Sequence, residues 1–221
     1  RAVPVFDDDD RITSWMGAAS DITDRKTAEE TQAILNAELA HRMKNTFAIV
    51  QAVVSQTLRQ AASVDEGRAA IQARLGALSR AQDILTGSNF TLADTGTIVA
   101  AALKPHHDVQ GRIDASGPAI DLAAQQALGL SLAIHELGTN AAKYGALSNA
   151  DGTVAISWRH DEGAFVFDWV EAGGPPVAMP TRRGFGSSLI EQIVASYFSG
   201  EARIDFDPAG IRFRLDGSPG T

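Results

Sequence analysis

Cysteine is missing from the 221-residue sequence. Disulfide bridges, thiolate zinc sites and cysteine nucleophiles are therefore excluded, and the absence agrees with a reducing compartment. No uninterrupted apolar run approaches the roughly 20 residues needed to cross a bilayer, and no basic-then-apolar signal segment opens the chain. We therefore expect a cytoplasmic protein with no membrane segment in this chain.

Positive charge is also scarce. The 19 lysines and arginines face 27 acidic residues, a formal net charge of −8, so no nucleic-acid surface is indicated. Hydrophobic residues make up 44% and charged residues 21% of the chain, which is typical of a globular protein. The length suffices for one or two domains with their own cores.

The first 24 residues have the pattern of a β-hairpin, with strands at residues 2–6 and 12–19 around four consecutive aspartates at 7–10. A lone hairpin is marginal in water, so we expect its sheet to lie upstream. The acidic run might suggest a metal site, but no further ligands recur at a fixed spacing, which favours a solvated turn.

Residues 25–89 predict two antiparallel helices, at about 27–62 and 67–85. Thr27 and Glu30 have the spacing of a capping box for the first helix. Its apolar residues recur three and four apart, a seam for a partner helix: Ile34, Leu35, Leu39, Met43, Phe47, Val50, Val54 and Leu58. Such hairpins often dimerise into four-helix bundles, but the stripes can instead bury against a sensor or the following domain and leave a monomer.

His41 lies on the first of these helices, with Glu38 three residues before it and Asn45 four residues after it on the same face. The neutral imidazole has a free nitrogen lone pair and can act as a nucleophile toward a γ-phosphoryl group. The alternative is an ordinary solvated histidine, which this segment alone does not exclude.

The rest of the chain is organised around an apolar helical pattern that carries Glu136 and Asn140 four residues apart, with Lys143 three residues further on. Oxygen ligands beside a cation suit magnesium that carries nucleotide phosphates. From spacing alone, a buried helix with a solvated polar edge remains equally possible. We expect Asp121 to cap this helix and Gly145 to end it in a left-handed conformation.

Residues 90–221 predict a mixed α/β domain. Helices are expected at 95–103 and 189–198, strands at 112–115, 153–158, 164–170, 202–206 and 211–215, and turns at 149–152 (of hairpin type) and 162–163. Adjacent histidines at 106 and 107 can hold a metal, although polar surface is the favoured interpretation.

Two glycine-containing segments add candidate ligand contacts. Glu171 stands at a strand end before Gly173, where a carboxylate can accept a hydrogen bond from an exocyclic amine such as that of adenine. Gly184 and Gly186 precede a helix, whose first amides and dipole favour an anion. Each signal is weak alone, but in series they indicate metal, base and phosphate positions in one domain.

From about residue 25 to 217 the chain resembles sensor histidine kinases of the HWE family. The family is named for a histidine and a Trp-x-Glu motif, here His135 and Trp169 with Glu171. The segment from His41 to Asn45 is similar to the phosphoacceptor block, and Gly184 to Gly186 to the phosphate loop.

The resemblance implies an α+β fold. An antiparallel helical hairpin of the dimerisation and phosphotransfer type would precede an α/β sandwich ATP-binding domain of the type shared by histidine kinases, gyrase and Hsp90. The implied domains are the end of a PAS or LOV sensor with its linker (1–24), the phosphoacceptor hairpin (25–89) and the ATP-binding catalytic domain (90–221).

The resemblance also implies the site residues. Asn140 and Glu136 would hold Mg2+, and the remaining ATP contacts would come from Lys143, Tyr144, Glu171, Gly173 and the lid glycines Gly184 and Gly186. His41 would accept the phosphoryl group beside Asn45. Arg42 stands where an acid commonly serves as base, so the proton acceptor stays open: Glu38 is a candidate, and Arg42 can neutralise phosphate charge instead.

The implied function is ATP-dependent autophosphorylation in a two-component signal-transduction system, with transfer to an aspartate of a response regulator. The implied assembly is a homodimer, with a monomer as the alternative, and any flavin would belong to an upstream sensor outside this chain. The rival interpretations are a non-catalytic nucleotide-binding scaffold and an ATPase of the same superfamily that uses water as acceptor.

Overall fold

The computed structural model describes residues 2–17, 20–87, 92–106, 111–179 and 189–218. By their internal packing, the residues form two compact units, Arg1–Gln51 and Ala52–Thr221. The domain boundaries expected after residues 24 and 89 stay predictions. No helix within the described ranges is long and apolar enough to cross a bilayer.

The first unit opens with the predicted β-hairpin. Strands β1 (Ala2–Phe6) and β2 (Ile12–Gly17) pair antiparallel. The carboxylate of Asp7 accepts hydrogen bonds from the backbone N–H groups of Asp9 and Arg11, at 3.0 and 2.9 Å. The acidic run therefore closes a turn on itself, which confirms the turn interpretation.

Helix α1 (Thr23–Gln60) is one continuous helix of 38 residues. It begins four residues earlier than predicted, where the Asp21 carboxylate accepts the Thr23 N–H at 2.9 Å. The Thr27 hydroxyl donates to the carbonyl of Thr23 at 2.7 Å, as a side chain inside a helix does, so the predicted capping box at Thr27 is wrong. Six large apolar side chains of α1 are more than half exposed: Ile34, Leu35, Leu39, Met43, Phe47 and Leu58.

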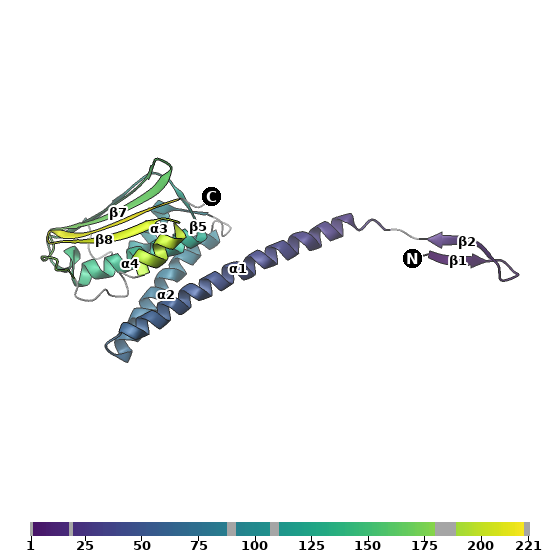
Figure 1. Ribbon diagram of the computed structural model, residues 1–221, viewed down its shortest axis with the longest axis horizontal. Coiled ribbons are helices and arrows are strands. Elements are labelled where there is room, and N and C mark those ends of the chain that lie inside the picture. Colours follow the sequence, from purple (N-terminus) through teal and green to yellow (C-terminus); the bar gives the residue numbers. More distant parts are fainter. Residues whose placement is uncertain (1, 18–19, 88–91, 107–110, 180–188, 219–221) are drawn as a thin grey trace. The chain divides into compact units, whose positions relative to one another are not determined.

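The second unit is built on a five-stranded mixed sheet in the order β4-β6-β7-β9-β8 (Figure 1). Its strands are β4 (Ile113–Ser116), β6 (Thr153–Asp161), β7 (Ala164–Ala172), β8 (Glu201–Asp207) and β9 (Gly210–Gly217). β4 runs parallel to β6, and the other neighbours are antiparallel. The five predicted strands are confirmed, as is the turn at 162–163, where Glu162 and Gly163 have positive φ.

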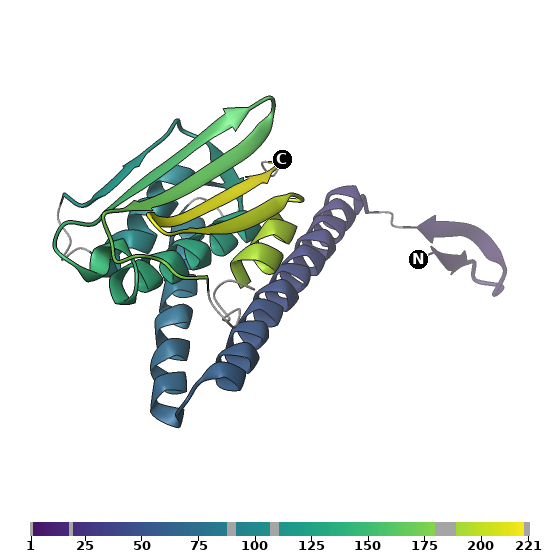
Figure 2. The same cartoon turned by 60° about the vertical axis from the view of Figure 1, so that its left-hand side comes forward.

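Helices cover one face of this sheet (Figure 2). They are α3 (Thr95–Leu103), α4 (Ala124–Lys143) and α6 (Ala195–Tyr197), with short turns η1 (Lys104–His106), η2 (Ala146–Ser148) and the π-helical η3 (Leu189–Val194). The core lies between the layers, where Phe165, Phe167, Trp169 and Phe213 of the sheet are almost fully buried. This arrangement confirms the expected α/β sandwich.

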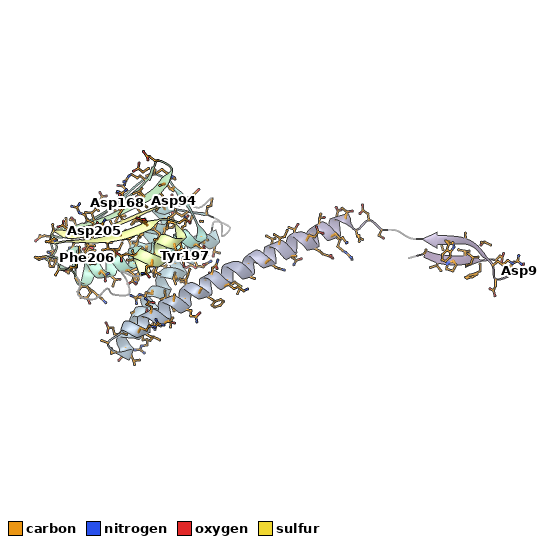
Figure 3. The ribbon with its side chains drawn as sticks, viewed as in Figure 1. Asp9, Asp94, Asp168, Tyr197, Asp205 and Phe206 are labelled. Carbon is orange, nitrogen blue, oxygen red and sulfur yellow. The ribbon has the colours of Figure 1, made fainter. Side chains whose placement is uncertain are left out.

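The other face of the sheet is polar. Arg159 pairs with Asp168 at 2.6 Å, and Arg214 pairs with Asp216 at 2.8 Å. Figure 3 shows Asp168 and Asp205 on the sheet and Tyr197 on the helical side. The charge alternation along the strands explains why only one face is covered, because burying these groups without full pairing would cost free energy.

Two short strands were not expected from the sequence. β3 (Leu92–Asp94) and β5 (Asp121–Ala123) pair antiparallel, and Asp121 lies opposite Asp94. The prediction that Asp121 caps α4 is therefore wrong: the cap residue is Ala123, whose N–H donates to the Gln126 side chain at 3.2 Å. The predicted hairpin-type turn at 149–152 is also wrong, since this segment leads from η2 into β6.

Helix α2 (Val64–Gly87) packs against α3 and α4 and so belongs to the second unit. Its apolar stripe, Ala77, Leu78, Ala81 and Leu85, is buried. The helix begins at Val64 rather than at residue 67, because the Ser63 hydroxyl accepts the Glu66 N–H at 3.2 Å and so caps its first turn.

Replacing Phe213 by alanine is expected to lower the free energy of unfolding by about 3–5 kcal/mol, because the ring is 1% exposed and its loss leaves a cavity in the core. Ile211→Ala on the same strand is the control, since Ile211 is only partly buried and should cost less than half as much. Urea unfolding of both variants measures the difference, and equal losses would contradict this description of the core.

Candidate functional site

The predicted polar face of α4 is present at its C-terminal end. Glu136 is 5% exposed, Asn140 is half-buried, and Lys143 and Tyr144 are exposed. Residues within the described ranges offer no hydrogen-bond partner to the Asn140 side chain. The last two turns of α4 therefore run from a buried acid to a solvent-facing cation.

Helix α4 ends near Gly145 for a different reason from the one predicted. The helix stops at Lys143, and Gly145 has φ of −105°, so a left-handed stop is wrong. A Cβ on Gly145 would collide with the Glu171 carboxylate and lie 2.9 Å from the Cα of Ala141. Glycine is needed here because the end of β7 approaches the end of α4 closely.

Glu171 connects these two ends. Its Oε2 accepts the backbone N–H of Ala146 at 2.8 Å, and its Oε1 accepts the indole N–H of Trp169 at 3.2 Å. Trp169 and Glu171 are two residues apart, so both point to the inward face of β7. The Trp-x-Glu motif is thus a hydrogen-bonded pair that holds the segment following α4.

Burial raises the pKa of the Glu171 carboxyl, and its hydrogen bonds to Ala146 and Trp169 act in the opposite direction. The side chain is only 4% exposed. Each carboxylate oxygen accepts one of these bonds and retains a second lone pair. The adenine contact implied for Glu171 stays a prediction. In the structure, Glu171 holds the segment that follows α4 through its hydrogen bond from Ala146.

The loop after β7 continues the same junction. Gly173 has φ of +72°, which favours glycine, and its carbonyl accepts the Asn149 side-chain N–H at 2.9 Å. A Cβ on Gly174 would lie 2.8 Å from the backbone nitrogen of Ala146. Thus the strand end, the loop at 149–152 and the end of α4 meet at one place.

Glu136 is bound by a residue that the sequence did not indicate. Arg74 of α2 donates from Nε to Oε1 at 2.6 Å and from Nη2 to Oε2 at 2.7 Å. Its Nη1 donates to the hydroxyl of Thr57 on α1 at 2.8 Å. Arg74 and Glu136 are 62 positions apart, and no local pattern signals such a contact.

The donors implied for magnesium fit that ion in kind. Asn140 offers an amide oxygen and Glu136 a carboxylate, and Mg2+ prefers oxygen ligands while keeping several waters and phosphates. Both Glu136 oxygens accept hydrogen bonds from Arg74. Asn140 therefore offers an amide oxygen directly, whereas a metal ion at Glu136 would lie beside the guanidinium of Arg74.

His135 lies beside Glu136 in the buried part of α4, 6% exposed, with its ring centroid 6.3 Å from that of His106 on η1. Neither Nδ1 of His135 nor Nε2 of His106 has a hydrogen-bond partner in the described part of the chain. Burial lowers the pKa of His135 from 6.5 to about 4, which Glu136 partly opposes. His135 is therefore a neutral side chain at physiological pH.

The remaining predicted residues are placed by the backbone alone or not at all. Glu38, His41 and Arg42 lie within α1, and nothing is described of their side chains, while Asn45 is half-buried. Gly184 and Gly186 lie outside the described residues. The roles implied for these residues stay predictions.

Among the residues that the structure describes, no three histidine, aspartate or glutamate side chains gather in a way that could hold a metal ion. The acidic turn at residues 7–10 is among the segments that lack such a group. The suggested site at the adjacent histidines includes His107, which lies outside the described ranges.

Comparison with known proteins gives consistent results. Residues 38–119 match the model of the HWE histidine kinase family. Over 201 residues the chain is 41% identical to a blue-light-activated histidine kinase of Brucella anthropi and 39% identical to one of Brucella ovis. Each alignment covers 89% of this chain and 41% of the relative, so the chain spans less than half the length of these relatives.

Solved structures show a similar fold. A blue-light-activated histidine kinase from Erythrobacter litoralis matches with a TM-score of 0.56 and 19% identity, over 99% of this chain and 69% of that chain. The separate histidine kinase domain of the same protein matches with a TM-score of 0.55 and 17% identity, over 67% of this chain and 74% of that chain. At these identities the likeness shows the fold.

We expect the free energy of unfolding to rise between about pH 4 and 6.5 through His135. Its pKa is lower in the folded than in the unfolded state, so the unfolded chain binds more protons in this window. The expected contribution is on the order of 3 kcal/mol. Urea unfolding at intervals from pH 4.5 to 7.5 measures it, and His135→Asn should reduce the slope. The pKa of His106 is shifted in the same direction and that of Glu171 in the opposite one, and both groups remain in the variant. Only the contribution of His135 should therefore disappear, and an unchanged slope would refute the assignment.

Gly145→Ala should lower the free energy of unfolding by about 1–3 kcal/mol, because the new methyl group displaces the Glu171 carboxylate and leaves buried donors unpaired. Trp169 loses its partner, so its fluorescence should change as well. Gly76→Ala is the control: a Cβ there meets only the Arg80 guanidinium, at 3.4 Å, and alanine in a helix should stabilise by up to about 1 kcal/mol. The same sign in both variants would contradict the close approach.

Proposed function

Because the chain belongs to the HWE histidine kinase family, we propose that it carries the kinase activity of a two-component sensor. The γ-phosphoryl group of ATP is transferred to His41, and from there to an aspartate of a response regulator. The junction of α4 and β7 carries the proposal: the Glu171–Ala146 hydrogen bond ties the Trp-x-Glu strand end to the segment that follows the helix bearing Asn140.

In the transfer step, a ring nitrogen of His41 attacks the γ-phosphorus in line. A nitrogen–phosphorus bond forms, the bond from the γ-phosphorus to the bridging oxygen breaks, and ADP leaves with the electron pair. The proton on the other ring nitrogen passes to a base, for which Glu38 is the proposed acceptor by its helical spacing. Such chemistry depends mostly on positioning and charge neutralisation. Arg42 and Asn45, on the same turns of α1, are the proposed positioning residues.

In the nucleotide site, Asn140 and Glu136 would hold Mg2+, which neutralises phosphate charge when bound. Lys143 is exposed at the end of α4 and is proposed to contact the phosphates, and Tyr144 is 74% exposed and is proposed to contact the nucleotide. Glu171 and Gly173 would face the adenine. Gly184 and Gly186 are proposed as the hinge of a loop over the phosphates.

The proposed partners follow from the exposed side of α1. Its apolar side chains from Ile34 to Phe47 are proposed to pack against a second copy in a homodimer, because an exposed seam at helical spacing is costly in water. The relatives are named as blue-light-activated kinases, so we propose that a flavin-binding sensor supplies the input from outside residues 1–221.

Incubation with γ-labelled ATP and magnesium tests the proposal. The chain should acquire an acid-labile label that is stable to base, as phosphohistidine is, and His41→Ala and Asn140→Ala should each reduce it by at least about 100-fold. The control is His160→Ala, since His160 is exposed on β6 and should leave the label unchanged.

Two outcomes would overturn the proposal in favour of the rivals. Nucleotide binding without label in any variant would indicate a non-catalytic scaffold. Steady phosphate release that His41→Ala leaves unchanged would indicate an ATPase with water as acceptor.

A further inference from the structure

Three polar side chains from three helices meet beside the candidate nucleotide site. Arg74 of α2 uses two of its nitrogens for the carboxylate of Glu136 on α4 and a third for the hydroxyl of Thr57 on α1. All three belong to the compact unit Ala52–Thr221. The guanidinium thus joins both helices of the predicted phosphoacceptor hairpin to the helix that carries Asn140.

This ion pair is largely shielded from water. The side chains of Arg74 and Glu136 are 14% and 6% exposed, and Thr57 is 3% exposed. A two-pronged guanidinium–carboxylate contact is among the strongest charged hydrogen bonds, and a buried acid left without its partner is strongly disfavoured. Glu136 therefore requires a cation wherever α4 stays buried.

The contact extends along both helices. The Ser131 hydroxyl of α4 donates to the Ala77 carbonyl of α2 at 3.4 Å, and the apolar stripe of α2 is buried on the same side. Figures 1 and 2 both show α2 alongside the helices of the sandwich, on the side away from the sheet. The ion pair lies at the end of this interface nearest to Asn140.

The guanidinium of Arg74 and a nucleotide-bound magnesium ion would both interact with the carboxylate of Glu136. Glu136 lies four residues before Asn140, on the same face of α4, and the proposed function gives both to the magnesium of a bound nucleotide. Both of its oxygens accept hydrogen bonds from Arg74, and a divalent cation in contact with them would repel the adjacent guanidinium.

We propose that Arg74 and magnesium-nucleotide compete for Glu136, so that contact of α2 with α4 and nucleotide binding oppose each other. The inference rests on the proposed nucleotide site. Arg74 acts as a positioning residue: it holds α2 on α4 in the nucleotide-free protein and releases it when Glu136 turns to the metal. By linkage, a change in α1 that withdraws Thr57 weakens the hold of Arg74 and raises nucleotide affinity.

Fluorescence anisotropy with a labelled ADP analogue and Mg2+ tests the competition on the whole chain. Arg74→Gln should bind roughly tenfold more tightly than the unmodified protein, because the competing cation is gone. The matched control is Arg68→Gln, also on α2, because the Arg68 side chain is 71% exposed and pairs with the exposed Asp65. Arg74→Lys, which keeps the charge and loses the two-pronged geometry, should give an intermediate affinity.

Glu136→Gln separates competition from a purely structural ion pair. Both Arg74→Gln and Glu136→Gln remove the contact, so both should speed amide hydrogen exchange in residues 64–87. Their effects on nucleotide affinity should be opposite, since only Glu136→Gln removes a proposed metal ligand. Adding Mg2+ and ADP to the unmodified protein should also speed exchange in α2.

Two results overturn the inference in distinguishable ways. If magnesium-dependent nucleotide binding is present and Arg74→Gln binds no more tightly than Arg68→Gln, the competition is wrong and the nucleotide site stands. If no variant binds nucleotide with magnesium, the proposed function fails and takes this inference with it.

Discussion

The ion pair between Arg74 and Glu136 is the interaction on which the arrangement of α2 and α4 depends. Helix α4 is buried along most of its length, yet it carries an acid in its last buried turn. A buried carboxylate without a partner would be strongly destabilising, typically by about 3–5 kcal/mol. An arginine from α2 supplies that partner, and α2 is thereby tied to α4 of the sandwich domain.

A second junction fixes the other end of the site. Glu171 accepts hydrogen bonds from Ala146 and from Trp169, so one carboxylate holds the end of β7 to the segment that follows α4. This gives the Trp-x-Glu motif a physical reason, because an indole two residues away on the same face orients the acid. The two acids of the candidate site, Glu136 and Glu171, therefore both hold elements of the domain together.

Local sequence patterns predicted the secondary structure that depends on neighbouring residues. The alternating sequence of β6 and β7 predicted their strands, and α3 was predicted with its observed bounds. The predictions for the two ends of α4 were wrong. Gly145 is required by the close approach of Glu171, and Asp121 lies in β5, which pairs with β3. Within the site, the face of Glu136 and Asn140 followed from spacing. The contact of Arg74 with Glu136 could not be predicted in this way, because a contact between two distant segments leaves no periodic pattern in either of them.

The account stands on magnesium-dependent recognition of a nucleotide by the end of α4. Isothermal titration of ADP into the protein, with and without Mg2+, measures this directly, and Asn140→Ala separates the proposed ligand from the rest of the fold. The account predicts binding that is at least about tenfold tighter with magnesium, and a loss of that difference in the variant. Equal affinity with and without the metal, or a variant that behaves as the unmodified protein does, would contradict it.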